Sequence, residues 1–199
     1  MSPKVTPLLN KLFNIRPAEW PRLALLFLMY LVVLTGINWG EPIVEAAFLE
    51  QVGVQFLPWA FVVNAAFSIL SIAIYTAFAD RVDNTILLLV ILGLSMVGVI
   101  IGLALLGRGL VTLTYPLLYF VLNVPLLDIF NVHWATYVNG FYDTQSAKRI
   151  IPVLASGARI SGIVAGLTLP LLNRYLTPGG IILILLGSLA VTALLAAAS

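Results

Sequence analysis

Long apolar segments with few charged side chains recur along this chain of 199 residues and constrain its fold more than any other feature. Six such segments occur, near residues 18–40, 56–79, 85–107, 110–139, 150–173 and 179–198. Each reaches the roughly 20 residues that an α-helix needs to cross a bilayer. Because backbone N–H and C=O groups in hydrocarbon must bond within the protein, segments of this kind form helices there. The sequence therefore predicts an all-α membrane protein with six transmembrane helices.

The composition supports this fold and excludes several kinds of function. Hydrophobic residues make up 61% of the chain and charged residues only 9%, whereas soluble domains carry about 25% charged residues on average. There is no cysteine, so disulfide and thiol chemistry is excluded, and His133 is the single histidine. No metal centre or cofactor is therefore expected. The basic residues form no run of the kind that binds nucleic acid, so we expect the lipid bilayer, and not nucleic acid, as a partner.

The distribution of lysine and arginine predicts the orientation in the membrane. Residues 1–17 are expected to form a cytoplasmic segment, and residues 18–199 the transmembrane domain. Most of the ten basic residues then fall on one side: Lys4, Lys11, Arg16, Arg22, Arg81, Lys148 and Arg149. Loops rich in lysine and arginine stay in the cytoplasm, so both termini are expected there, with the chain in the cell inner (plasma) membrane. Within the N-terminal segment, Leu8, Leu9, Leu12 and Phe13 form either a short interfacial helix or part of a disordered tail.

Polar side chains mark four of the six expected helices, namely the first, second, fourth and fifth. The candidate residues for a substrate pathway are Asn38, Glu41, Glu45, Asn64, Asp128, Asn131, His133 and Arg159. Polar groups in hydrocarbon are costly and usually face a cavity or a partner, so we expect these side chains to turn inward. The third and sixth helices have few polar groups and are expected to face lipid. This spacing of three predicts a 3+3 inverted repeat.

Alternatives remain for several of these residues. Glu41 and Glu45 either line the pathway or lie solvated in the outer interface. His133 either relays protons or is a hydrogen-bonded structural residue. Asp128, which apolar sequence flanks, is either a site or gating residue or one member of a structural buried pair. Its expected counter-ion is Arg159, because an unpaired buried charge would be costly.

The fifth helix carries two tracks of small residues at intervals of four. Gly157, Ser161 and Ala165 form one track, and Ala158, Gly162 and Gly166 form the other. Small residues four apart let helix backbones approach closely. Each track therefore serves either static packing or a sliding interface between helices.

Two stretches of the chain resemble the bacterial and plastid ATP/ADP translocase (nucleotide transporter) family. Residues 13–20, FNIRPAEW, resemble the start of that family's first helix, and residues 141–152, FYDTQSAKRIIP, resemble the turn before its fifth helix. The resemblance covers roughly residues 12–175 and implies a fold related to the major facilitator superfamily. The dipeptide Asp80-Arg81 is also similar to the Asp-Arg of that superfamily's loop between helices 2 and 3.

The resemblance implies a transporter of twelve helices in two halves that works by alternating access, with helices 1 and 4 lining the central cavity. This chain would supply an N-terminal half, and its partner would be a second six-helix half, either in a continued chain or in a homodimer. The implied substrate is a nucleotide or another small organic solute, moved by antiport. In this family basic residues lie near the outer end of helix 1, whereas this chain has Glu41 and Glu45 there, which repel nucleotide anions.

A non-transporting membrane anchor or regulatory domain with a transporter-like fold is the alternative function. An enzyme is not expected, because the chain has no recognisable catalytic set such as Ser with His, paired Asp, or His-Glu-x-x-His. His133, the one histidine, has no Ser, Asp or Glu at a spacing that would suggest such a set.

Overall fold

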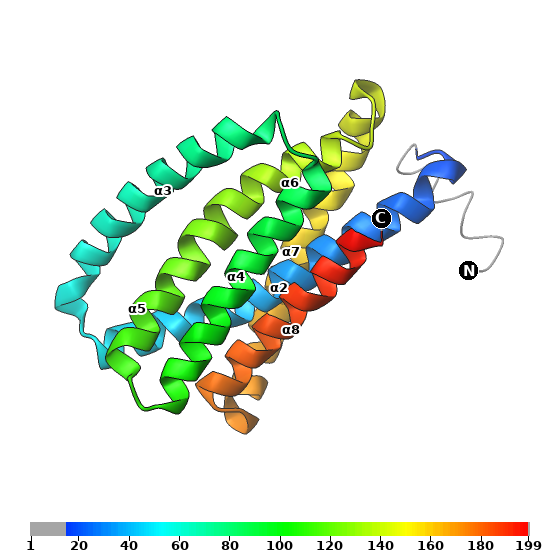
Figure 1. The fold of residues 1–199 in the computed structure, drawn as a ribbon. Coiled ribbons are helices and arrows are strands. Elements are labelled where there is room, and N and C mark those ends of the chain that lie inside the picture. Colours follow the sequence, from blue (N-terminus) through cyan, green and yellow to red (C-terminus); the bar gives the residue numbers. More distant parts are fainter. Residues whose placement is uncertain (1–14, 199) are drawn as a thin grey trace.

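The computed structural model describes residues 15–198, and the regular elements of this range are helices (Figure 1). In chain order they are η1 (Pro17–Glu19), α2 (Trp20–Gln51), η2 (Val54–Phe56), α3 (Leu57–Ala79), α4 (Asn84–Gly107), α5 (Val111–Val121), η3 (Leu122–Ile129), α6 (Phe130–Asn139), α7 (Thr144–Tyr175) and α8 (Pro178–Ala197). The expected interfacial helix around Leu8, Leu9, Leu12 and Phe13 lies outside the described residues.

Six helical segments are long and apolar enough to cross a membrane, and this confirms the prediction of a multi-pass membrane protein. They run Pro17–Gln51, Val54–Ala79, Asn84–Gly107, Val111–Asn139, Thr144–Tyr175 and Pro178–Ala197. The fourth of these spans consists of α5, η3 and α6 without a break, and η3 is a π-helix. Lipid would surround the apolar outer faces of the bundle.

Two helices are longer than the sequence predicts. The first span continues past residue 40 to Gln51, with Pro42 inside it, so Glu41 and Glu45 lie on the helix and not in a loop. The fifth span begins before residue 150 because Asp143 caps it. The Asp143 carboxylate accepts a hydrogen bond from the backbone N–H of Ser146 at 2.7 Å, which satisfies a donor that a helix start leaves free.

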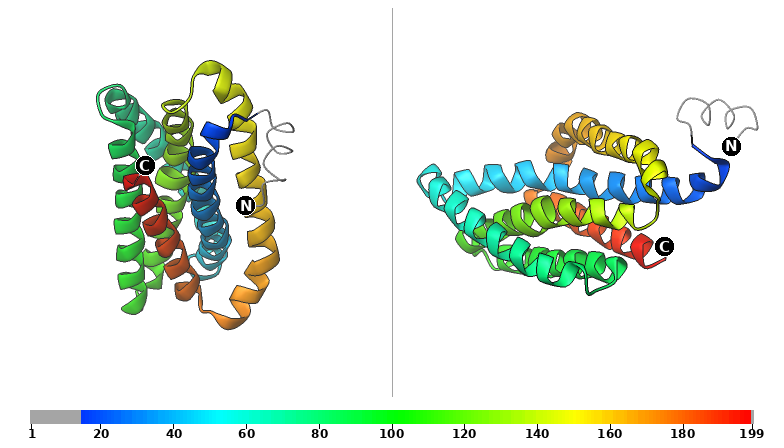
Figure 2. Two further views of the ribbon diagram at one scale, coloured as in Figure 1. Left: turned by 90° about the vertical axis from the view of Figure 1, so that its right-hand side faces the viewer. Right: turned by 90° about the horizontal axis from the view of Figure 1, so that it is seen from above.

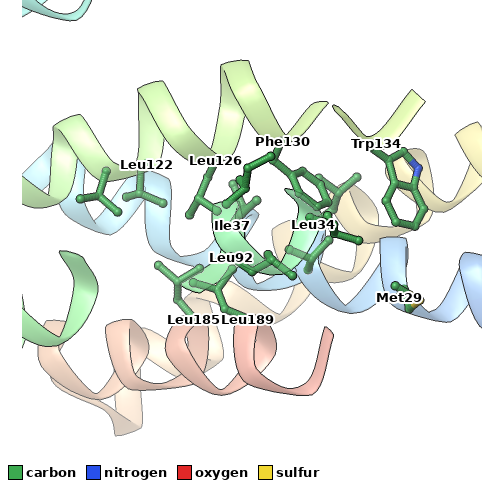
Figure 3. Packing of buried hydrophobic residues seen from close by; sticks show 14 of the residues in the cluster. Met29, Leu34, Ile37, Leu92, Leu122, Leu126, Phe130, Trp134, Leu185 and Leu189 are labelled. Carbon is green, nitrogen blue, oxygen red and sulfur yellow. The ribbon is translucent and has the colours of Figure 1, made fainter. Parts of the chain in front are cut away.

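The centre of the bundle is α2, which packs against α5, α7 and α8 (Figure 2). On the far side of this group, α4 packs against α8, α5 and α6. Figure 3 shows the core where four of these elements meet. Ile37 of α2, Leu92 of α4, Leu126 of η3 and Leu185 of α8 lie there, each at most 1% exposed. The core is therefore apolar and built from helices far apart in the sequence.

Two helices, α3 and α7, flank the bundle on opposite sides (Figure 2). In the most apolar stretch of α3 no residue is buried. The share of buried residues in the corresponding stretch is 28% for α7, 44% for α4 and 39% for α8. The expectation that the third and sixth helices face lipid holds for one side of each. Leu94 of α4 and Leu194 of α8 are exposed, but Leu92 and Leu189 on the same two helices are fully buried. Helices that are apolar all round can serve both the core and the lipid.

Candidate functional site

Polar contacts join the starts of the first and fifth spans at one end of the bundle. The carboxylate of Glu19, in η1, accepts a hydrogen bond from Ser146 Oγ at 3.0 Å and forms an ion pair with Arg149 at 3.2 Å. Next to them, the Arg22 guanidinium lies 4.9 Å from the centre of the Phe141 ring. Glu19 and Ser146 belong to the two separate stretches that carry the family resemblance, so these stretches meet in space. From the sequence, Arg22 and Arg149 were used only to predict the topology. Their contacts with Phe141 and Glu19 were not predicted.

A cavity of about 600 Å³ opens between these groups, and Glu19, Arg22, Tyr142 and Asp143 line part of it. The backbone N–H of Ser146 holds the pKa of the Asp143 carboxyl below its usual value. Burial raises the pKa of Tyr142, whose hydroxyl oxygen is buried without a hydrogen-bond partner in the described structure. Carboxylates and a guanidinium stand at the same opening, so this cavity has no clear preference for a solute of one charge.

Within the spans, α7 packs closely on α2. Asn38 Nδ2 donates a hydrogen bond to Ser161 Oγ at 3.0 Å, and Trp39 Nε1 donates one to Thr168 Oγ1 at 2.9 Å. A Cβ added to Gly157 would lie 3.3 Å from the ring of Phe27. The small-residue track that starts at Gly157 therefore serves close packing between these two helices. Asn38, a predicted pathway residue, contributes to the same contact.

Asp128 lies in the π-helix η3 and is turned toward α3. Ser68 Oγ donates a hydrogen bond to Asp128 Oδ2 at 2.5 Å, and the Asp128 side chain remains partly exposed. The backbone N–H of Phe130 bonds to the carbonyl of Pro125, five residues earlier, which is the π-helical pattern. Segments of this kind occur often at functional sites and at kinks. Ser68, a polar residue of the second span, was not predicted as the partner of Asp128.

Asp128 and Arg159 do not form the expected pair, so that prediction is wrong. Neither charge has an ion-pair partner among residues 15–198, where the ion pair found joins Glu19 to Arg149. Arg159 is exposed on α7. At 100° per residue it lies on the side of the helix roughly opposite Gly157, which packs against α2. The two charges therefore form no ion pair with each other within one chain.

His133 is fully buried and links three helices. Its Nε2 lies 2.8 Å from the carbonyl oxygen of Asn84, and its Nδ1 lies 3.0 Å from the hydroxyl of Tyr75. A carbonyl only accepts, so Nε2 carries the proton, and Nδ1 then accepts from the Tyr75 hydroxyl. Both nitrogens are thus used in contacts between α3, α4 and α6, which fits the structural alternative for His133. Its place is the packed core and not an open surface.

A second cavity, of about 180 Å³, lies between α6 and α7 over Tyr30 of α2. Its lining residues are Tyr30, Asn131, Trp134, Ala135, Val138, Ile151, Leu154 and Ala155. The ring of Tyr30 stacks on that of Trp134 with 4.9 Å between centroids. Asn131 is exposed at this cavity and donates a hydrogen bond from Nδ2 to the carbonyl of Leu127 at 2.6 Å. Of the predicted pathway residues, Asn131 is the one in the lining of this cavity.

The remaining predicted residues lie apart from this cavity. Glu41 is half-buried and Glu45 exposed, both on the last third of α2. The 32 residues of α2 span about 48 Å, whereas the hydrocarbon layer is about 30 Å thick, so this end of the helix extends into the interface unless it is strongly tilted. That geometry fits the solvated alternative for Glu45, which is exposed, better than for Glu41, which is half-buried and further from the helix end. Asn64 is half-buried on α3, one turn before Ser68.

No family model, curated protein or solved structure matches this chain. The resemblance to the ATP/ADP translocase family therefore depends on residues 13–20 and 141–152 alone.

Proposed function

We propose that this chain is one half of a major facilitator-type transporter, related to the ATP/ADP translocase family, that moves a small organic solute by alternating access. The supporting observation is that the chain leaves three polar groups of its membrane spans open. Asp128 is partly exposed, and Asn131 and Arg159 are exposed, although all three belong to spanning segments. Polar groups in such segments face a water-filled cavity or a protein partner.

These residues define an open face, formed by Asp128 and Asn131 of η3 and α6 together with Ala155 and Arg159 of α7. The proposal places the solute pathway along this face, with a second six-helix half opposite. It includes the 3+3 inverted repeat, the plasma membrane as location and both termini in the cytoplasm, as the lysine and arginine distribution predicts.

Alternating access requires helices that bend or rock, and η3 offers a place for this. Its π-helical hydrogen bonds interrupt the regular pattern between α5 and α6 at Pro125. A change in this segment would move Asp128 and Asn131 relative to Arg159, which belongs to a different helix. Binding of solute at the open face would thereby be coupled to the shape of the fourth span.

The solute is a nucleotide, as in the resembling family, or another small organic molecule. Glu41, Glu45 and Glu50 lie along the end of α2 that the predicted topology places outside. Like charges repel, so these side chains oppose the approach of a nucleotide anion from that side. A neutral or cationic organic solute therefore fits this end of the molecule better than a nucleotide does.

The test is uptake by the purified chain in liposomes, measured with labelled ADP, ATP and a set of neutral and cationic organic solutes. We expect flux of at least one solute, a loss of flux in Asn131→Leu, and unchanged flux in Asn173→Leu. Asn173 is the matched control, because it is an exposed asparagine near the end of α7 and away from the open face. Absence of flux for all solutes would overturn the proposal and favour a non-transporting membrane anchor.

A further inference from the structure

Arg159 is exposed at the middle of α7, the helix that runs from Thr144 to Tyr175. In the part of the chain that the structure describes, its guanidinium takes part in no ion pair or hydrogen bond. An arginine halfway along a membrane-spanning helix is costly in hydrocarbon, and such residues face a partner of opposite charge or water. The contacts within this chain leave that requirement unmet.

The surface around Arg159 is shaped for the close approach of another helix. At 100° per residue, Ala155, Gly162 and Gly166 fall with Arg159 within about 60° of the helix circumference. A Cβ added to Gly162 or to Gly166 would meet no atom within 4 Å. The glycines of this second small-residue track are therefore vacant, whereas the track that starts at Gly157 is filled by α2. Vacant small residues beside an unpaired charge favour a protein partner over lipid.

Asp128 is the complementary charge at the same depth. Asn131 and Ala155 line one cavity, which sets α6 and α7 in register. Asp128 comes three residues before Asn131, and Arg159 comes four residues after Ala155. The two helices are antiparallel, so both steps lead in the same direction along the bundle. At 1.5 Å per residue these steps are about 4.5 Å and 6 Å, so the two charges differ in depth by about 2 Å.

We propose that two copies of the chain associate through the open face, with Arg159 of each copy paired to Asp128 of the other. A two-fold axis along the membrane normal keeps every residue at its depth, so charges at equal depth can meet across it and form two equivalent pairs. Each copy has Asp128 beside α3 and Arg159 on α7, and these helices flank the bundle on opposite sides (Figure 2). The inference rests on the proposed function in one respect: the second copy would be the second six-helix half that this function requires.

The test uses charge reversal in two separate copies. Each variant is labelled with donor or acceptor dye at a single cysteine in place of the exposed Arg108, which is a unique label because the chain has no cysteine. Energy transfer between copies is then measured in liposomes. We expect dimers of the wild type, at least a tenfold weaker association of Arg159→Asp alone and of Asp128→Arg alone, and recovery to within about threefold when these two variants are mixed. Arg174→Asp, an exposed arginine near the end of the same helix, should dimerise like the wild type.

Mixing distinguishes a pair between copies from a pair within one copy. One single variant has acidic residues at positions 128 and 159, and the other has basic residues at both. In a mixed dimer, opposite charges therefore meet only between the two copies and never within one copy. If the mixture stays monomeric while the double variant Asp128→Arg/Arg159→Asp dimerises, the charges pair within one chain and the proposal fails. It also fails if either single reversal associates as tightly as the wild type.

A second series does not depend on the folding of charge variants. Gly162→Leu and Gly166→Leu should each weaken association at least tenfold, because the added side chains fill the vacant track. Gly187→Leu in α8 is the matched control, since Gly187 is also exposed with no atom within 4 Å of an added Cβ. Equal association of all three variants would exclude this face of α7 as the interface. Solute flux measured on the same liposomes separates the two proposals. Flux by a monomer refutes the dimer, and with it the need for a second half, but leaves transport standing. A dimer without flux refutes transport and leaves the dimer standing.

Discussion

Replacing Gly36 by alanine should destabilise the bundle where α2 meets α8. A Cβ built on Gly36 would lie 1.9 Å from Oγ and 2.7 Å from Cβ of Ser188, and 3.6 Å from Cα of Leu185. The Ser188 hydroxyl can rotate away only by giving up its 2.7 Å hydrogen bond to the carbonyl of Leu185. Its Cβ is fixed to the backbone, so the two helices must move apart.

The size of the effect follows from two opposing contributions. Forcing extra atoms into a packed core costs about 1–3 kcal/mol, whereas alanine is favoured over glycine in a helix by about 1 kcal/mol. We therefore expect Gly36→Ala to lower the free energy of unfolding by about 0–2 kcal/mol, and to lie about 1–3 kcal/mol below a variant that gains the helix preference without the clash. Gly187→Ala gains the same helix preference with no atom near the new Cβ, so it should be neutral or slightly stabilising.

Unfolding of both variants by sodium dodecyl sulfate in mixed micelles, followed by helical circular dichroism, measures the difference. Adding Ser188→Gly to Gly36→Ala should recover most of the loss, because it removes both nearest atoms. The coupling in this double-mutant cycle should then approach the steric cost of about 1–3 kcal/mol. If Gly36→Ala unfolds together with Gly187→Ala, the close contact between α2 and α8 is absent and the reasoning is refuted.

Three further predictions concern polar contacts. His133→Leu should cost about 1–3 kcal/mol in the same unfolding assay, because it leaves the Tyr75 hydroxyl without its partner in the core, and Tyr75→Phe in the same background should restore part of the loss. The partly exposed pair Glu19–Arg149 should show a coupling of only about 0–1 kcal/mol in a double-mutant cycle, smaller still in high salt; a large, salt-independent coupling would contradict this. The folded-state pKa of Asp143 lies below its ordinary value of 3.8, so its stabilising effect is present above about pH 3.8 and lost as the pH falls through the folded-state pKa. Asp143→Asn should accordingly differ from the wild type near neutral pH and converge with it in acid, and a constant difference across this range would exclude the charge as the cause.

The number and approximate position of the helices could be predicted because a bilayer leaves a long apolar segment almost no alternative to a helix. Their ends were harder to predict. The first apolar segment was expected to end near residue 40, but the helix continues to Gln51 with Pro42 inside it. Conversely, the cap at Asp143 starts the fifth span earlier than its apolar run suggests.

The neighbours of each helix could not be predicted from composition. Asp128 and Arg159 were predicted to pair because they carry opposite charges on two polar helices that were expected to be neighbours. The rotation of each helix decides the outcome instead. Asp128 is bonded to Ser68 of α3, and Arg159 lies on the side of α7 away from α2. Periodicity shows which residues share a face, but only packing shows what that face meets.

Exposure alone does not identify an interface in a membrane protein, and α3 and α7 show why. The outer face of α3 is widely exposed, with Phe61 at 55% and Ile69 at 72%, yet side chains of this kind are as well solvated by lipid as by protein. The exposed face of α7 includes Arg159 and the vacant Gly162 and Gly166, which lipid solvates poorly or fills loosely. The cost of each group in hydrocarbon therefore distinguishes the two faces. This cost assigns the outer face of α3 to lipid and the Arg159 face of α7 to protein. For this reason Arg159→Leu should stabilise the isolated monomer and weaken the dimer.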